Sequence, residues 1–243
     1  MMNMAKAGTE KAGAIRYGRV YASSVIQDYQ DGKVYTLGNS AVIHHHCGFA
    51  FLIGNPTEEE LSALYREMMR QDFGRFLLFC DEERIVDHFR DLPGVCIRGR
   101  YFFEYPLSDS KPAEVPQGYV LQEIDEELAL MLKGRITLSF SWRNFDEFKK
   151  SGKGYCLTVN NKPVAWAFSA AVSDDEIDIG VECLEEYRHQ GLSAVVVKEM
   201  IRYILDAGKK PVWACQDTNE FSGKLAEKCG FIRTGECCVI NVM

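Results

Sequence analysis

Hydrophobic positions in the first half of the chain switch between strand-like and helix-like spacing. Residues 33–54 are rich in aromatic and β-branched side chains, which favour strands. Residues 57–70 predict a helix, because they open with a capping box and then place apolar side chains at helical spacing. The apolar run at residues 75–80 predicts a buried strand, and residues 82–92 predict a short helix. We find no catalytic motif in this half.

The second half follows the order β-α-α-β-β-β-α-β-α-β. Capping residues begin its first two helices, and Asn160-Asn161 between apolar runs predicts a hairpin. This order predicts an α/β fold with a mixed sheet. The expected elements are a strand at 118–125, helices at 125–136 and 144–152, strands at 154–159, 163–172 and 176–183, a helix from about Gly191 to Ala207, a strand at 210–216, a helix at 219–230 and one or two strands within 231–243.

A change in composition divides the two halves. Residues 106–118 hold three of the seven prolines and few apolar side chains, so they read as a linker. We therefore predict an N-terminal α/β region of unknown role at 1–112 and a second region at 113–243. We expect the first region to pack on the second and to shape a substrate cleft there. Alternatively, the first region forms the contact of a homodimer.

Composition and charge narrow the class of protein. The hydrophobic fraction is 47% and the charged fraction 26%, as in soluble globular proteins. A net charge of −7 argues against nucleic acid or an anionic membrane as the main partner. The opening residues lack the apolar core of a signal peptide, and no apolar run is long enough to span a membrane. We expect a cytoplasmic protein whose nine cysteines are free thiols, since no C-x-x-C pair occurs.

The segment EEYRHQGLSAVVVKEM, residues 185–200, carries the clearest candidate chemistry. Its turn joins a predicted strand to a predicted helix that starts near Gly191. Unpaired N–H groups and the helix dipole at such a start favour phosphate, and Arg188 adds a positive charge. Ser193 and Ala194 are small enough to let a ligand approach. Alternatively, Gly191 only eases the turn and Arg188 is a solvated side chain, since neither common nucleotide-binding glycine motif is present.

The wider pattern resembles a known family. R-x-x-G followed by a small residue, with Asn219-x-x-Ser222 and LAEKCGF downstream, resembles the GNAT superfamily of acyl-CoA-dependent N-acyltransferases. The motifs from Trp213 to Phe231 and at 148–154 are similar to the branch that includes zwittermicin-resistance-type acetyltransferases. The resemblance implies a GNAT-like fold for residues 113–243 and acetyl-CoA as co-substrate.

The resemblance also implies a donor site between two parting parallel strands, 176–183 and 210–216. A backbone N–H near Cys183 would polarise the acyl carbonyl, as in an oxyanion hole. The residues implied to hold acyl-CoA are Cys183, Arg188, His189, Gln190, Gly191, Leu192, Ser193, Ala194, Asn219 and Ser222.

Transfer to an amine requires a proton acceptor, because an alkyl ammonium has a pKa near 10. The strand at 176–183 places Glu176, Asp178 and Glu182 on one face, and Glu182 lies nearest the expected acyl group, with Asp178 next. These carboxylates could equally be solvated or ion-paired. Many family members carry a Tyr that acts as the general acid, and the corresponding residue in this chain is Ala226. Ser222, Cys215 or water could protonate the thiolate instead, or it could leave unaided.

Two further features are weaker candidates. A strand through HHHC, residues 44–47, would place His44 beside His46, but no second ligand pair follows at a usual spacing, so we expect no metal. Ser141 and Trp142 follow the first helix of the second region, where the family's acceptor pocket often lies. They are acceptor candidates, although Trp142 is as readily explained as core.

The sequence therefore favours an enzyme that transfers acetyl from acetyl-CoA to a small-molecule amine by direct attack in a ternary complex. The leading alternative is a non-catalytic acyl-CoA-binding or regulatory module, which the missing Tyr favours. Transfer of a longer acyl group, or to a protein acceptor, is a third interpretation.

Overall fold

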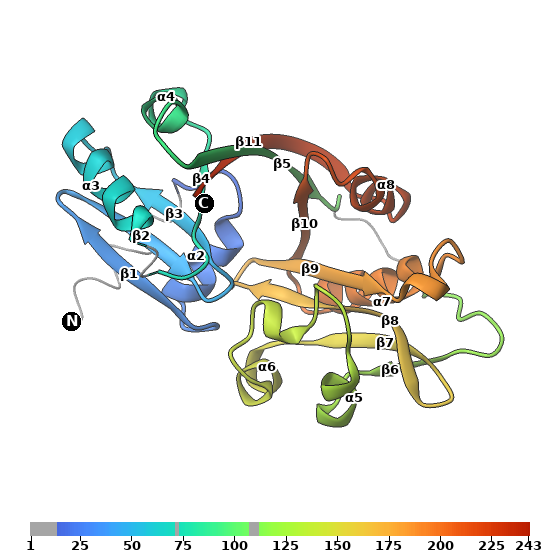
Figure 1. Cartoon of the computed structure of the whole chain (residues 1–243). Helices are drawn as coiled ribbons and strands as arrows, with labels where there is room; N and C mark the ends of the chain where they lie inside the picture. The colour runs from blue at the N-terminus through green and yellow to red at the C-terminus, as the bar shows by residue number, and fades with distance from the viewer. Residues whose placement is uncertain (1–13, 71–72, 107–111) are drawn as a thin grey trace.

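The strands of this protein join into one mixed sheet (Figure 1). The computed structural model describes residues 14–70, 73–106 and 112–243. The sheet order is β1-β2-β3-β4-β11-β5-β10-β9-β8-β7-β6. The strands are β1 (Gly32–Leu37), β2 (Ser40–His45), β3 (Phe49–Ile53), β4 (Leu77–Cys80), β5 (Val95–Glu104), β6 (Val120–Glu123), β7 (Gly154–Val159), β8 (Lys162–Val172), β9 (Glu176–Cys183), β10 (Lys210–Gln216) and β11 (Ile232–Val242).

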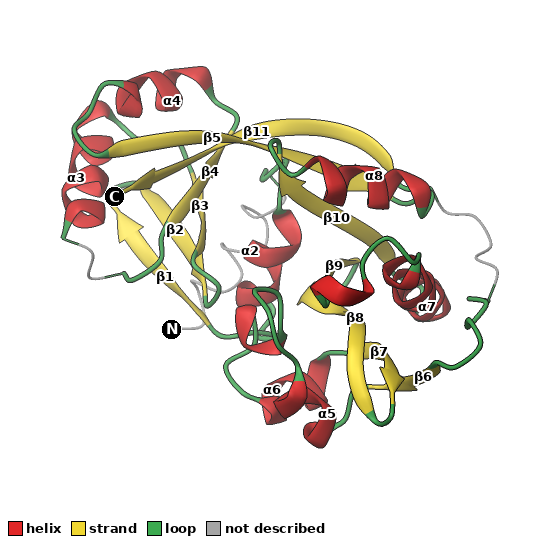
Figure 2. Cartoon of the chain, turned by 45° about the vertical axis from the view of Figure 1, so that its right-hand side comes forward, coloured by secondary structure: helices red, strands yellow, loops and turns green. Residues whose placement is uncertain are grey.

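Helices cover both parts of the sheet (Figure 2). Figure 1 places α3 and α4 beside the N-terminal strands, and α5, α6 and α7 around the C-terminal ones. The α-helices are α2 (Arg19–Ile26), α3 (Glu58–Met69), α4 (Glu83–Arg90), α5 (Glu126–Met131), α6 (Phe145–Ser151), α7 (Leu192–Asp206) and α8 (Glu220–Lys228), and the 3₁₀ turns are η1 (Leu138–Phe140) and η2 (Glu185–Tyr187). In the described residues, none of the helices has the length and hydrophobicity needed to cross a membrane.

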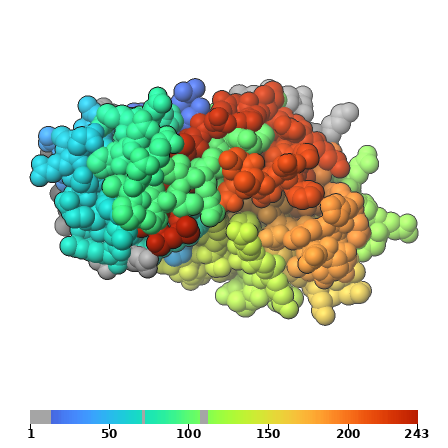
Figure 3. Space-filling model, turned by 45° about the horizontal axis from the view of Figure 1, so that its top comes forward, coloured from blue at the N-terminus to red at the C-terminus, as the bar shows by residue number. Residues whose placement is uncertain are grey.

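The two halves of the chain interlock at the centre of the sheet. The C-terminal strand β11 lies between β4 and β5, and it pairs antiparallel with both. Strand β5 in turn pairs antiparallel with β10. In Figure 3 the C-terminal residues, in red, lie directly against the cyan and green N-terminal residues. One sheet therefore runs through both regions that we expected from composition, and the division near residue 112 stays a prediction.

Local signals placed most of the helices and strands correctly. Thr57 and Glu60 form the expected capping box at the start of α3. Asn160 and Asn161 turn the β7–β8 hairpin with φ of 50° and 61°, as a type I′ turn requires. The helix expected from Gly191 to Ala207 is α7, with those two residues as its caps. The predicted mixed α/β class is confirmed.

Buried apolar surface fixes α7 against the sheet. The helix buries an apolar face that includes Val196, Met200 and Ile204, all with 0% exposure, against β7, β8 and β9. Burying each such side chain contributes roughly 1.5–3 kcal/mol. The N-terminus of α7 is therefore held rigidly beside the end of β9. The nine cysteines are all free thiols, as expected.

Candidate active site

Strands β9 and β10 part after a short parallel ladder (Figure 1). Their register runs from Glu176–Lys210 to Asp178–Val212 and then stops. Beyond that point β9 continues beside β8, whereas β10 continues beside β5 as far as Gln216. The two strands thus diverge toward their carboxyl ends, and we call the part of the sheet where they are no longer paired the opening.

Backbone donors on β9 face this opening. The N–H of Leu184 donates to the carbonyl of Val164 at 2.9 Å, and this bond extends the ladder between β8 and β9. Since ladder bonds alternate along an antiparallel strand, the N–H groups of Val181 and Cys183 must face β10 instead. Both lie beyond the last β9–β10 pair. Sequence reasoning named only the neighbourhood of Cys183, and the register adds Val181.

The turn after β9 ends in two residues with left-handed backbone. His189 has a φ of 63° and Gly191 a φ of 81°. Gly191 caps α7 without a side-chain bond, and a Cβ placed on it would meet no protein atom within 4 Å. The first N–H groups of α7 have no partner within the helix, and the space beside Gly191 is open, an arrangement that suits anion binding.

Arg188 ties this turn to the end of β9. Its Nε donates to the Cys183 carbonyl at 3.3 Å, and its guanidinium lies 3.7 Å from the Glu182 carboxylate. Glu182 also accepts the N–H of Cys183 at 3.3 Å. Of the other residues expected here, Gln190 accepts a bond from the Tyr119 hydroxyl at 2.9 Å, and Leu192 is buried. The sequence-predicted turn residues are thus contiguous with the opening.

Helix α8 attaches to β10 through the other two predicted residues. Asn219 caps α8 by accepting the Ser222 N–H at 3.2 Å. The Ser222 hydroxyl in turn accepts the Trp213 indole N–H at 3.1 Å. Burial raises the pKa of the neighbouring Cys215 thiol, which makes it a poorer acid. Ala226 is fully buried.

We expect Asn219→Ala to lower the free energy of unfolding by about 1 kcal/mol, since it removes a helix cap. Thr57→Ala removes the cap of α3 on the opposite part of the sheet and serves as the matched control. Urea denaturation should give similar losses for both variants. A much smaller loss for Asn219→Ala than for Thr57→Ala would contradict the assigned cap of α8.

The three carboxylates of β9 occupy different environments. Glu176 forms an ion pair with Arg19 at 2.7 Å. Asp178 is 5% exposed and accepts a hydrogen bond from the Tyr21 hydroxyl at 2.7 Å. Burial raises the pKa of Asp178 to about 6, although the Tyr21 bond and the charge of Arg100 both oppose this. The charge state of Asp178 therefore changes not far below neutral pH.

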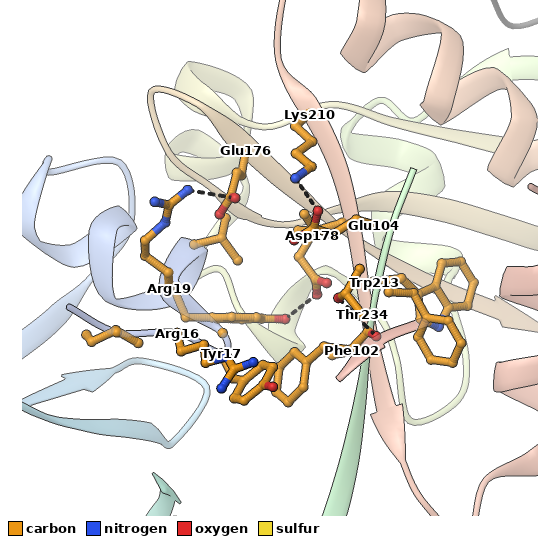
Figure 4. Close-up of a pocket in the computed structure, with 17 residues that line it drawn as sticks. Arg16, Tyr17, Arg19, Phe102, Glu104, Glu176, Asp178, Lys210, Trp213 and Thr234 are labelled. Carbon is orange, nitrogen blue, oxygen red and sulfur yellow. Dashed lines mark hydrogen bonds and ion pairs between the residues drawn. The ribbon is translucent and has the colours of Figure 1, made fainter. Parts of the chain in front are cut away.

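Asp178 lines a cavity of about 370 Å³ (Figure 4). The cavity lies between the segment that leads into α2 and the first residues of β9 and β10. Its lining comprises residues 15–21 and 102–104, Glu176, Asp178, Lys210, residues 212–214 and Thr234. Sequence reasoning missed both this cavity and Tyr21, because no local motif marks either.

The predicted acceptor residues lie elsewhere. Ser141 and Trp142 have exposed fractions of 0% and 1%, and neither lines the cavity. The Trp142 indole donates to the Ser169 carbonyl at 2.8 Å and packs edge-on against Phe148. These contacts are those of a core residue. A role of Ser141 and Trp142 in acceptor binding stays a prediction.

The histidine run does not gather as the strand pattern suggested. Strand β2 ends at His45, so His46 lies in the following turn. His44 bonds the Arg75 carbonyl at 3.0 Å, whereas His46 lies 3.9 Å from Asp31. Burial lowers the pKa of His45 to about 3. Within the described ranges, no three His, Cys, Asp or Glu side chains are grouped to hold a metal.

Comparison with known proteins identifies the family and the fold of this chain. The family described as GNAT acetyltransferase matches residues 17–239. The Bacillus subtilis (strain 168) protein called uncharacterized N-acetyltransferase YdfB is 24% identical over 230 residues, covering 89% of this chain and 87% of that protein. A solved GCN5-related N-acetyltransferase-like protein from Streptococcus suis 89/1591 is similar in fold, with a TM-score of 0.76, 20% identity and full coverage of both chains. A GCN5-related N-acetyltransferase from Kribbella flavida gives a TM-score of 0.63 at 14% identity, over 98% and 94% of the two chains. Because the family match covers residues 17–239, this chain belongs to the GNAT acetyltransferase family.

Proposed function

We propose that this protein transfers acetyl from acetyl-CoA to the amine of a small molecule, by direct attack within a ternary complex. The observation that carries the proposal is the opening between β9 and β10, which ends at the unobstructed N-terminus of α7. A long donor with a pyrophosphate at one end and a thioester at the other fits this combination of an anion site and a row of backbone donors.

Each part of the opening has a defined task. The N–H groups at the start of α7, next to Gly191, bind the pyrophosphate, and Arg188 adds its charge. The pantetheine arm lies along β9 and accepts hydrogen bonds from the N–H groups on the free edge of that strand. The N–H of Val181 or Cys183 polarises the thioester carbonyl and stabilises the tetrahedral intermediate.

The reaction needs positioning more than strong acid catalysis. The amine attacks the carbonyl carbon, the carbon–sulfur bond breaks, and the nitrogen gives up one proton. The thiolate of CoA is a stable leaving group, so transfer proceeds without a Tyr at the position of Ala226. Holding both substrates in one site is worth several kcal/mol.

We expect calorimetry to show acetyl-CoA binding to the wild-type protein with a micromolar Kd. Absence of any binding would contradict the proposal. Release of free thiol from acetyl-CoA should then be measured across a panel of amines. Tight binding with no thiol release for any amine would instead support the second candidate, a non-catalytic acyl-CoA-binding module, which the buried Ala226 favours.

A further inference from the structure

The cavity beside Asp178 opens where the two central strands begin to part. Asp178 and Val212 form the last β9–β10 pair, and both line the cavity. The first N–H that faces the opening beyond that ladder, Val181, is three residues further along β9, or roughly 10 Å. A small molecule in the cavity therefore lies at the inner end of the donor cleft.

In the described part of the chain, most of the charged side chains that line this cavity form ion pairs, and Asp178 and Arg16 are the exceptions (Figure 4). Glu176 is neutralised by Arg19 and Glu104 by Lys210, so these two pairs cancel. Arg16 places its guanidinium over the Tyr17 ring, 5.0 Å from the ring centroid. Asp178, by contrast, has no ion-pair partner among the described lining residues and is held by the phenol of Tyr21. An unpaired buried carboxylate attracts a cationic group more strongly than an exposed one does.

Aromatic side chains form another part of the wall. The Tyr17 and Phe102 rings stack with their centroids 4.9 Å apart, and both line the cavity. Val212 and Ala214 of β10 belong to the same lining, whereas the Trp213 side chain turns to the opposite face, where its indole bonds Ser222. Such a surface favours an apolar body next to the amine, rather than a second charge.

We propose that the acceptor is a primary monoamine with an apolar body, that it binds in this cavity, and that Tyr21 positions Asp178 to take its proton. This inference rests on the proposed function and specifies its acceptor. The N-terminal region then completes the acceptor site through residues 15–21.

Asp178 suits this task better than Glu182. The Glu182 carboxylate is already bonded to the Cys183 N–H and lies close to Arg188, outside the cavity lining. Tyr21 bonds Oδ2 of Asp178, which leaves Oδ1 to accept a proton. Asp178 first takes one proton from the bound ammonium through Oδ1 and releases it to solvent, which leaves a neutral amine. As the nitrogen then bonds to the carbonyl carbon, it loses a second proton to Oδ1, and the carbon–sulfur bond pair leaves with the CoA thiolate. The thiolate then gains a proton from solvent, so the products are an amide and CoA thiol.

Several groups set the charge state of Asp178. Tyr21 faces it from α2, Arg100 from β5 and Glu176 from its own strand. The thiols of Cys47 and Cys215 also lie close enough to interact with it. The Tyr21 bond lowers the pKa of Asp178, so its removal raises that pKa and demands a higher pH for an ionised base.

The test compares Tyr21→Phe with Tyr29→Phe, each measured with acetyl-CoA and 2-phenylethylamine. Tyr29 makes the same kind of bond, to Asp174 at 2.8 Å, but lies outside the cavity lining. In Tyr21→Phe we expect kcat to fall about tenfold and the acid limb of kcat/KM to move upward by about half a pH unit or more. Tyr29→Phe should leave both unchanged. An unmoved acid limb in Tyr21→Phe would overturn the positioning role, since loss of packing alone does not shift it.

The substrate class is tested with three probes: 2-phenylethylamine, spermidine and glycine. We expect kcat/KM to be at least about tenfold higher for 2-phenylethylamine than for the other two. Preference for spermidine or glycine would overturn the class. Calorimetry of 2-phenylethylamine without acetyl-CoA separates the hypothesis of an amine site from that of an acetyl-CoA site. If the protein does not bind acetyl-CoA, the amine should still bind in the cavity. No amine binding, with normal acetyl-CoA binding, would remove the acceptor site alone.

Discussion

Replacing Gly191 by valine is expected to weaken acetyl-CoA binding by at least about 100-fold. The residue caps α7 with a φ of 81°, and open space surrounds the position of its missing Cβ. A branched side chain would project into the space that we assign to the pyrophosphate, and would keep the phosphates away from the helix N–H groups. Isothermal titration of acetyl-CoA into both proteins measures the effect.

Gly208 provides a matched control at the opposite end of the same helix. It has a φ of 70° and, like Gly191, would place a Cβ in open space. Valine at either position is strained by roughly 1–2 kcal/mol or more, because its backbone is left-handed. Both variants should therefore unfold at similarly lower urea concentrations, while only Gly191→Val loses the ligand. Equal affinity in the two variants would contradict the assignment of the turn.

Asp178→Asn is expected to lower kcat by roughly 100-fold or more while making the folded protein more stable at pH 8. The activity falls because an amide cannot accept the proton of the attacking amine. The stability rises because the wild type must hold a carboxylate that burial disfavours. The asparagine oxygen can still accept the Tyr21 hydroxyl, so the packing is preserved.

The stability gain should depend on pH in a defined way. The pKa of Asp178 is about 6 in the folded protein, against 3.8 ordinarily. Below about pH 4 the carboxyl is protonated in both states, and burial carries no charge penalty. As pH rises toward 6 the unfolded chain ionises first, so wild-type stability falls by an amount on the order of 3 kcal/mol.

Urea denaturation of wild type and Asp178→Asn at pH 4 and at pH 8 measures this difference. The advantage of the variant should be full above about pH 6 and absent below about pH 4. If the variant is less stable than the wild type at pH 8, then the surroundings of the Asp178 carboxylate offset the cost of burying its charge more fully than its contacts indicate. Retained activity at any pH would exclude Asp178 as the proton acceptor.

The proposed donor site could be derived from sequence because its signals are local. A glycine after a strand, at the start of an apolar helical stripe, needs only neighbouring residues to be recognised. The caps of α3 and α8 are likewise contained within four residues. The expected positions of Gly191 and Asn219 at helix starts are confirmed for these reasons.

The proposed acceptor site was not predictable from sequence because it depends on long-range contacts. Tyr21 and Asp178 are 157 positions apart, and only the completed sheet brings them together. Strand β5, which was not among the expected elements, carries Arg98, Gly99 and Arg100 at its centre, and these residues interrupt any apolar pattern. Helix α2 starts at Gly18 without a side-chain cap, so it too lacks a start signal.

The most direct test of the account is a crystal structure of the protein with bound CoA. We expect the pyrophosphate against the N–H groups of Leu192 and Ser193, and the thiol between β9 and β10 near Val181. Displacement of the Glu182 carboxylate from the Cys183 N–H would fit a pantetheine arm along β9. A CoA molecule bound anywhere outside this opening, with the β9 edge left free, would contradict the central claim.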